Sequence, residues 1–192
     1  LHLRDGGRGD RDGVANGAIV DPIEPVIPIV GATQVAAGSS STCALLVDRT
    51  VNCWGDGSYG QLGDGIQTTR SIPAPVHDLG GTATAVSVGG GWACAIVDTT
   101  TETGVVRCWG RNDWAQLGNQ DHSMETTPIT VPGVAHATQI SVGGFTTCAV
   151  TDAGTAFCWG MNNSGQTGTG SPDDIVLPTD LGLTGVTQIA VG

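Results

Sequence analysis

The chain has 192 residues, of which 31 are glycine and only 13% are charged, and its formal net charge is −11. An average soluble domain has about 25% charged residues. Lysine is absent, so seven arginines face 18 acids. Binding to a phosphate backbone needs clustered Lys and Arg, so no nucleic-acid partner is expected. No apolar run approaches the roughly 18 residues of a membrane helix, so no membrane span is expected either.

The N-terminal residues 1–20 match no later part of the chain. They are rich in Gly, Arg and Asp, a composition typical of a flexible linker. We therefore predict a linker at 1–20 and a repeat domain at 21–192. The start at Leu1 and the end within a repeat favour a fragment of a longer chain.

A repeat of about 50 residues dominates the rest of the sequence. The tripeptide Cys-Trp-Gly recurs at 53–55, 108–110 and 158–160, and Gln61, Gln116 and Gln166 follow it in register. Short alternating apolar segments and many glycines at this period are typical of β-propeller blades. We predict an all-β fold, a partial propeller of about three four-stranded blades. The unit boundaries are expected near 35–85, 86–139 and 140–187, with the start of a further unit at 188–192.

Each repeat also has two cysteines, and these are predicted to face each other across a hairpin. The pairs are 43 and 53, 94 and 108, and 148 and 158, each centred on a short turn. Directly opposite residues of antiparallel strands lie close enough for a disulfide. Closing an 11-residue loop would stabilise the fold by about 2.7 kcal/mol. The alternatives are buried free thiols or a metal site, although the close spacing that zinc ligands need is absent. Disulfides imply a secreted or cell-surface protein. We list the candidate disulfide cysteines as Cys43, Cys53, Cys94, Cys108, Cys148 and Cys158.

The repeat pattern resembles that of the regulator of chromosome condensation family. The likeness covers residues 35–192 and is strongest at Trp-Gly-x-x-x-x-Gly-Gln-Leu-Gly. It implies blades of a seven-bladed propeller. The cysteine pairs are similar to those of bacterial, exported members. Ala115 stands where the family has glycine.

Residues that recur in every unit have a structural interpretation. Trp54, Trp109 and Trp159 are expected to pack the blades together. Gly63, Gly118 and Gly168 are expected at turns or close backbone contacts. Asn112 and Asn162 suit left-handed turn positions.

Residues that differ between units are the candidates for specific binding. Tyr59, Trp92, Trp114 and Phe145 fall in aligned variable loops, where aromatic side chains are common interface anchors. We predict that they form an exposed aromatic binding face. The alternative is that they pack under neighbouring loops.

No catalytic motif accompanies the repeats. The four histidines are scattered, and no nucleophile elbow, zinc-protease motif or phosphate loop is present. We predict no enzyme activity, no cofactor and no metal. The expected function is a non-catalytic module that presents loops to a protein or glycan outside the cytoplasm. The alternatives are exchange-factor-like regulation of a small GTPase, which the family resemblance implies, and a purely structural spacer. The rest of a longer propeller, or a second copy, would be needed to close the ring.

Overall fold

The computed structural model describes residues 29–192, which form β-strands and no helix. The predicted linker at 1–20 lies outside the described residues. Nothing among the described residues is a helix long and apolar enough to cross a membrane.

The strands of the first blade are β1 (Ala32–Ala37), β2 (Ser41–Leu46), β3 (Val51–Gly55) and β4 (Arg70–Pro75). Those of the second are β5 (Thr82–Val88), β6 (Trp92–Asp98), β7 (Val105–Gly110) and β8 (Glu125–Thr130). Those of the third are β9 (Ala137–Gly143), β10 (Thr146–Thr151), β11 (Ala156–Gly160) and β12 (Ile175–Asp180).

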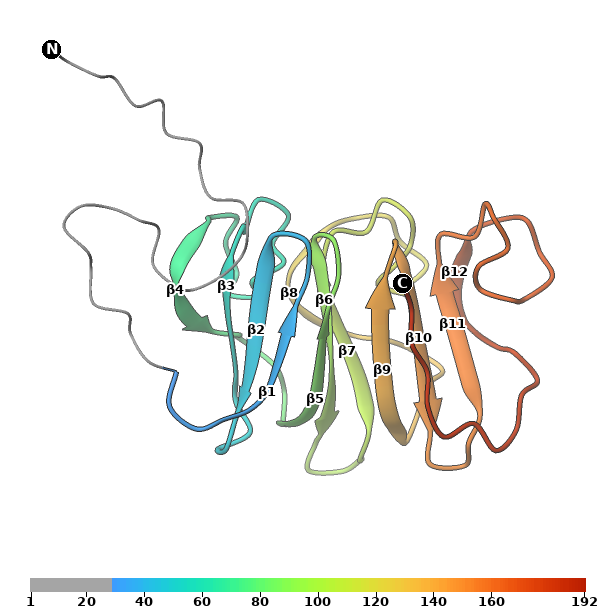
Figure 1. Ribbon diagram of the computed structural model, residues 1–192, viewed down its shortest axis with the longest axis horizontal. Coiled ribbons are helices and arrows are strands. Elements are labelled where there is room, and N and C mark those ends of the chain that lie inside the picture. Colours follow the sequence, from blue (N-terminus) through green and yellow to red (C-terminus); the bar gives the residue numbers. More distant parts are fainter. Residues whose placement is uncertain (1–28) are drawn as a thin grey trace, which may run out of the picture.

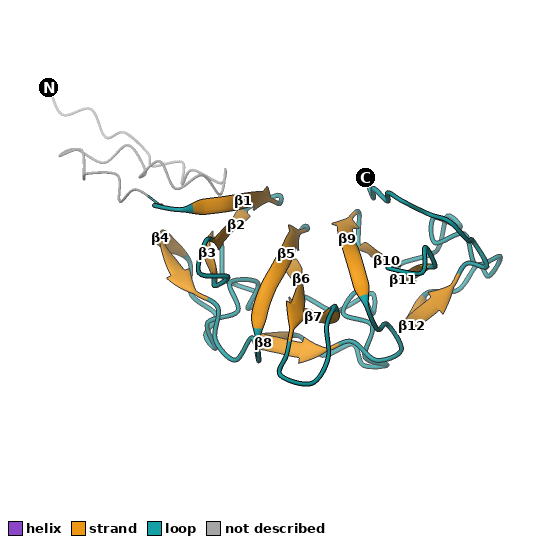
Figure 2. Cartoon of the chain, turned by 90° about the horizontal axis from the view of Figure 1, so that it is seen from below, coloured by secondary structure: helices purple, strands orange, loops and turns teal. Residues whose placement is uncertain are grey.

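Each blade is a four-stranded antiparallel sheet whose strands follow one another in chain order. The three sheets stand side by side (Figure 1). Seen along the perpendicular direction they form an arc, with β1, β5 and β9 on its concave side (Figure 2). The prediction of three four-stranded propeller blades is confirmed.

A disulfide closes the central hairpin of every blade. Cys43 pairs with Cys53 across β2 and β3, and the equivalent pairs are Cys94–Cys108 and Cys148–Cys158. In each pair the Cα atoms are 4.1 Å apart, as directly opposite residues of a hairpin require. The pairing expected from the spacing is therefore confirmed.

The core lies between the blades, in two layers: one between the first and second sheets and one between the second and third. Strand residues alternate between faces, so in the second blade Trp109 packs against the first blade while the Cys94–Cys108 bridge faces the third. The first interface includes Leu45, Leu62, Val86 and Val97. The second includes Ile96, Leu117, Val142 and Trp159. Every blade therefore depends on its neighbours to cover its apolar surface.

Candidate binding site on the loop rim

The loops after the first and third strands of every blade emerge on one rim of the arc. A four-stranded meander reverses direction at each turn, so these two loops end on the same side. Phe145 lies between β9 and β10, Tyr59 and Trp114 follow β3 and β7, and Trp92 is the first residue of β6, directly after such a loop. The candidate binding residues are therefore brought to one edge of the molecule.

The recurring tryptophan and glutamine join adjacent blades beneath this rim. Trp109 Nε1 donates a hydrogen bond to the Gln61 carbonyl at 2.9 Å, and Trp159 Nε1 does the same to the Gln116 carbonyl at 2.9 Å. The Gln61 side chain also accepts the Tyr59 backbone N–H at 2.8 Å. Gln61 thus stabilises its own loop through its side-chain oxygen and contacts the next blade through its backbone carbonyl.

Two of the recurring glycines lie under the tryptophan rings. A Cβ on Gly63 would be 2.8 Å from Trp109 Nε1, and a Cβ on Gly118 would be 2.7 Å from Trp159 Nε1. Both glycines also have positive φ, at 69° and 70°. Gly168 has a similar φ of 73°, but no atom lies within 4 Å of its Cβ position.

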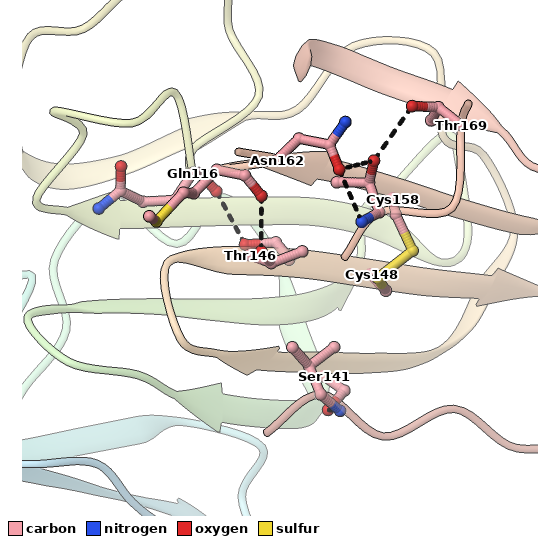
Figure 3. Close-up of a disulfide and its surroundings, with 11 residues drawn as sticks. Gln116, Ser141, Thr146, Cys148, Cys158, Asn162 and Thr169 are labelled. Carbon is pink, nitrogen blue, oxygen red and sulfur yellow. Dashed lines mark hydrogen bonds between the residues drawn. A yellow bond between two sulfur atoms is a disulfide. The ribbon is translucent and has the colours of Figure 1, made fainter. Parts of the chain in front are cut away.

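The recurring asparagines act differently from the expectation. Asn112 and Asn162 do not have positive φ, so the prediction of left-handed turn positions is wrong. Both are buried, and their side chains hold the loop: Asn162 Oδ1 accepts the backbone N–H of Thr167 at 2.9 Å and its hydroxyl at 2.7 Å (Figure 3). The left-handed position in this loop is Ala115, whose φ is 55°; it stands where the repeat pattern has a glycine.

Two of the four variable aromatic rings flank one arginine, and the other two contact one of those rings. Arg111 Cζ lies 5.0 Å from the centre of the Tyr59 ring and 5.2 Å from that of Phe145. Phe145 in turn stacks on Trp92 at 5.9 Å and meets Trp114 at 6.5 Å. Tyr59 comes from the first blade, Arg111 from the second and Phe145 from the third. We call Tyr59, Arg111, Trp114 and Phe145 the aromatic–arginine cluster.

Trp92 does not belong to the exposed part of this group. It is fully buried, so the expectation that it lies on an exposed face is wrong. Trp92 is the first residue of β6 and points toward the third blade, where its Nε1 donates to Thr147 Oγ1 at 3.2 Å. A Cβ on Gly89 would be 2.7 Å from the Trp92 ring, so that glycine makes room for it. The Phe145 ring stacks on the buried Trp92 ring.

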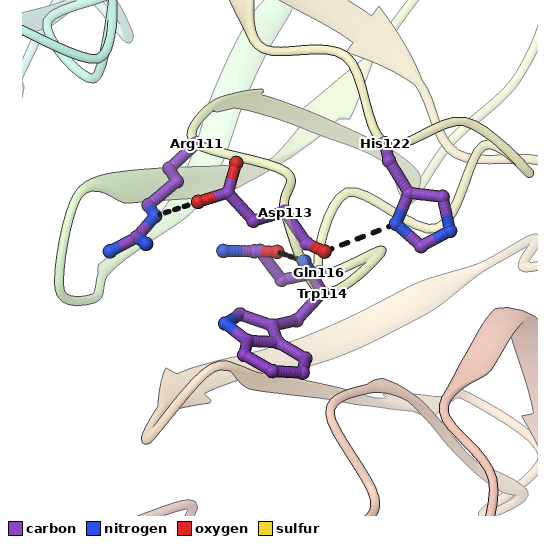
Figure 4. Close-up of polar contacts among 5 residues, drawn as sticks. All are labelled: Arg111, Asp113, Trp114, Gln116 and His122. Atoms are coloured by element: carbon purple, nitrogen blue, oxygen red, sulfur yellow. Dashed lines mark hydrogen bonds and ion pairs between the residues drawn. The ribbon is translucent and has the colours of Figure 1, made fainter.

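The remaining cluster members reach solvent. Tyr59 is 41% exposed and Trp114 is 36% exposed, while Phe145 is half-buried. Arg111 Nε donates to Asp113 Oδ2 at 2.6 Å, which leaves the two terminal amino groups of the guanidinium beyond that ion pair (Figure 4). Arginine between two aromatic rings is held by cation–π attraction, about 0.5–1 kcal/mol per contact at exposed sites.

The turn that carries Phe145 is strained. Gly144 and Phe145 form a two-residue turn between β9 and β10, with φ of 47° and 68°. Such a turn has positive φ at both positions and favours Asn-Gly or Gly-Gly. A bulky side chain with positive φ is an outlier, costing about 1–2 kcal/mol. This backbone conformation places the Phe145 ring beside Arg111.

A carboxylate occupies the position in the first blade that Arg111 has in the second. Burial raises the pKa of Asp56, but hydrogen bonds from Ser58, Thr69 and Gln61 outweigh it and hold the pKa below its ordinary value of 3.8. The third blade has Met161 at this position. The charge next to the recurring Trp-Gly therefore changes from blade to blade along the rim.

The fold does not bring the histidines of the described part of the chain together. His77, His122 and His136 are exposed and lie in three different loops. Within 29–192 no group of three or more His, Cys, Asp or Glu side chains could hold a metal ion. The His122 ring instead contacts the Asp113 carbonyl at 3.2 Å, next to Arg111 (Figure 4).

Comparison with known sequences decides the family. Two profiles described as regulator of chromosome condensation (RCC1) repeat match the chain, one at 32–61 and 137–166 and the other at 50–96, 103–150 and 153–192. The chain belongs to the RCC1 repeat family. Its relatives include human E3 ubiquitin-protein ligase HERC2, 34% identical over 167 residues, or 83% of this chain and 3% of HERC2. The Arabidopsis thaliana ultraviolet-B receptor UVR8 is 32% identical over 150 residues, or 77% of this chain and 33% of the receptor.

Two solved structures have the same fold. Human WBSCR16 superposes with a TM-score of 0.72 at 24% identity, covering 84% of this chain and 42% of that protein. Saccharomyces cerevisiae Prp20p gives 0.67 at 21% identity, covering 80% and 39%. The RCC1 repeats of this chain thus span about two-fifths of these solved chains, and a third or less of HERC2 and UVR8.

Sequence reasoning named the four aromatic residues as candidates but missed Arg111, which contacts two of them. The signal was present, because the residue after each Cys-Trp-Gly is Asp56, Arg111 or Met161. A charge-reversing position inside an otherwise regular motif of the RCC1 repeat is where blade-specific function is expected.

Proposed function

We propose that this chain is a non-catalytic RCC1-repeat module that binds a partner protein through the aromatic–arginine cluster, outside the cytoplasm. The cluster joins three blades on one rim and combines exposed aromatic surface with a guanidinium. Tyr, Trp and Arg are the residues most enriched at binding hot spots. A partner that presents an apolar side chain beside a carboxylate or carbonyl would fit it.

The strained Phe145 turn is the observation that carries this proposal. In the other two blades the equivalent turns are Ser39-Ser40 and Gly90-Gly91, which need no bulky residue at positive φ. Strain of this kind persists at sites where it serves binding or catalysis. The positive φ of Phe145 lowers the stability of the fold, and the same backbone conformation places the Phe145 ring against Arg111.

The disulfides support the proposed location. One bridge in each of three blades is expected of a protein that folds in an oxidising compartment, and the described residues contain no free cysteine. A bacterial exported relative with paired cysteines would share this feature. Peptide mapping of the native protein under non-reducing conditions tests the location, and three reduced pairs would contradict it.

The principal alternative is regulation of a small GTPase. Prp20p, which shares the fold, binds Gsp1p and histones. Release of labelled GDP from purified GTPases of the source organism distinguishes the two functions. Accelerated release by this chain would favour the alternative, and would overturn the proposed non-catalytic role.

The decisive experiment captures the partner at the cluster itself. A photo-crosslinking amino acid at Ser58, next to Tyr59, labels whatever protein contacts the rim in a cell-surface extract. The purified partner is then titrated against wild type, Arg111→Ala and Phe145→Gly. Both variants are expected to weaken binding at least tenfold, which corresponds to about 1.4 kcal/mol.

Two controls separate binding from folding. Thr100→Ala changes an exposed residue between β6 and β7, on the opposite rim, and should bind as wild type does. Phe145→Gly removes a half-buried ring, a loss of about 1 kcal/mol, and relieves strain of similar size, so its unfolding free energy should stay within about 1 kcal/mol of wild type. Unchanged affinity in both cluster variants would sink the proposal.

A further inference from the structure

The loop after the third strand contains a buried glutamine in the first and second blades, and only the first has all of its side chain hydrogen-bonded. Gln61 Oε1 accepts the Tyr59 N–H at 2.8 Å, and Gln61 Nε2 donates to Asp56 Oδ2 at 3.2 Å. In the second blade Gln116 Oε1 accepts the Trp114 N–H at 2.8 Å, which fixes the other end of the amide as the donor. Gln116 Nε2 is buried, and no acceptor reaches it within residues 29–192.

The missing acceptor follows from one residue difference between the blades. Asp56 supplies the carboxylate in the first blade, and Arg111 stands at the equivalent position in the second. The exchange removes the acceptor and puts further donors in its place. Buried polar groups of native proteins nearly always have a partner, so the orphaned nitrogen of Gln116 requires an explanation.

Arg111 also has unused donors. Its Nε donates to Asp113 Oδ2 at 2.6 Å, and no hydrogen bond to a described residue involves its two terminal amino groups. The Arg111 side chain is 25% exposed, so these groups are open to a partner. The Tyr59 and Phe145 rings lie beside the guanidinium and limit its movement. Such a held guanidinium is suited to a planar acceptor, because its N–H groups form a rigid fork.

The donors of Arg111 and Gln116 face one space. Figure 4 shows the Gln116 amide nitrogen turned to the side of the loop on which the Arg111 guanidinium lies. The indole of Trp114 lies near this side too, and its Nε1 has no hydrogen-bond partner among the described residues. The Phe145 ring, 6.5 Å from that of Trp114, adds an apolar surface. An acceptor that enters this space therefore meets several donors beside two aromatic rings.

A carboxylate satisfies these donors better than a neutral acceptor does. Its charge complements the guanidinium, and hydrogen bonds between charged partners are the stronger ones. It also has two oxygens, which Asp56 in the first blade divides between Gln61 Nε2 and Thr69 Oγ1. The side chains drawn around Gln116 Nε2 in Figure 4 belong to the surface, so a rotamer change opens a path to it, as is common at interfaces.

We propose that Arg111 and Gln116 form a carboxylate-binding subsite, which takes an aspartate or glutamate side chain of the partner protein. The carboxylate accepts from the terminal amino groups of Arg111 and from Gln116 Nε2. The residue next to it in the partner lies against Trp114 and Phe145. This inference rests on the proposed function for the source of the carboxylate, whereas the subsite itself can be tested without the partner.

The test uses the full 192-residue chain, labelled with ¹⁵N. The probe is 3-phenylpropionate, which joins a carboxylate to an apolar ring, and its neutral counterpart is 3-phenylpropanamide. NMR follows the side-chain N–H signals of Gln116 and Arg111 during each titration. The net charge is −11, so the ionic strength is kept at about 0.15 M, where charges beyond about 8 Å are screened. We expect saturable shifts of both signals with the acid, and at least tenfold weaker binding of the amide.

Two substitutions separate the contributions of the two residues. Arg111→Met introduces the residue that the third blade has at this position. Gln116→Glu keeps an oxygen for the Trp114 N–H but replaces the donor nitrogen with a second oxygen. Each should weaken binding of 3-phenylpropionate at least tenfold, measured at the Trp114 indole N–H signal, which both variants retain. Arg111→Met changes a surface side chain and decides the test if Gln116→Glu does not fold.

Arg49→Met is the matched control. It removes the same charge from an exposed residue of the β2–β3 turn, on the opposite rim, and should bind the probe as wild type does. Equal binding of the acid and the amide would overturn the subsite. So would the absence of a saturable shift at Gln116, or unchanged binding in Arg111→Met.

The partner captured at Ser58 then distinguishes this inference from the proposed function. A partner that depends on Phe145 but binds Gln116→Glu as it binds wild type would leave the proposed function intact and overturn the carboxylate subsite. Probe binding without any partner that depends on Phe145 would support the subsite and overturn the proposed function. A partner whose binding is lost on amidation of its C-terminus, but not on replacement of its acidic side chains, would overturn the side-chain assignment.

Discussion

Gly118 lies directly beneath the indole of Trp159, and a Cβ on it would be 2.7 Å from Trp159 Nε1. In this blade the motif reads Ala-Gln-Leu-Gly: the Gln116 carbonyl accepts the hydrogen bond from Trp159 Nε1, and Gly118 leaves room for the indole ring. Local loop geometry and packing between blades are therefore specified by the same few residues.

The first prediction compares two equivalent glycines. Gly118→Ala should lower the unfolding free energy by more than 2 kcal/mol, because it adds a collision with a buried ring to the strain of positive φ. Gly168→Ala should cost only the strain, about 1 kcal/mol. Urea denaturation of both variants measures the difference. Equal destabilisation would mean that the seat at Gly118 is not a tight contact.

The second prediction concerns the indole hydrogen bond. Trp109→Phe keeps most of the ring but leaves the buried Gln61 carbonyl without its donor, a loss of about 1–3 kcal/mol. Trp114→Phe changes an exposed ring and should stay within about 0.5 kcal/mol of wild type. Chemical denaturation followed by circular dichroism distinguishes them. If both variants unfold like wild type, the Trp–Gln contact does not hold the blades together.

The third prediction concerns the disulfides. Replacing both Cys43 and Cys53 with Ala should lower the unfolding free energy by about 3 kcal/mol, because the bridge closes a short loop in the unfolded chain. Replacing Cys94 and Cys108 should cost slightly more, since their loop is four residues longer. Melting curves with and without reductant provide the control: reductant should affect wild type more than either variant. No change on reduction would contradict the prediction.

The fourth prediction concerns acid stability. The pKa of Asp56 is lower in the fold than its ordinary 3.8, so the carboxylate contributes stability above pH 3.8 that is lost as the pH falls through the lower folded value. Asp56→Asn should therefore be less stable than wild type near neutral pH, with the gap closing below pH 3.8. The measurement is unfolding free energy against pH from 2 to 7. A gap that stays constant from pH 2 to 7 for Asp56→Asn would exclude this role.

The sequence alone determined the blades and their bridges. Hairpin alternation is local, so the positions of two cysteines around one turn were sufficient to pair Cys148 with Cys158. The sequence showed that a Trp and a Gln recur in every repeat, but not that Trp109 of one blade hydrogen-bonds to the Gln61 carbonyl of the preceding blade. A period of about 50 residues shows which positions are equivalent, but not which atoms of successive blades touch.

Tertiary structure decided which rim residues are buried and which meet. Trp92 and Trp114 are both aromatic residues at variable positions, yet one is buried on Thr147, 55 residues away in the chain, and the other reaches solvent. Arg111 lies between Tyr59 and Phe145 only because three blades curve around a common axis and bring their loops to one rim. The role predicted for the asparagines was wrong for the same reason. Asn162 hydrogen-bonds to Thr167 and Asp173 across a folded loop, and a local φ preference does not reveal these partners. Alternation and turn chemistry act over a few residues and can be read directly, whereas contacts between blades depend on the twist and packing of whole sheets.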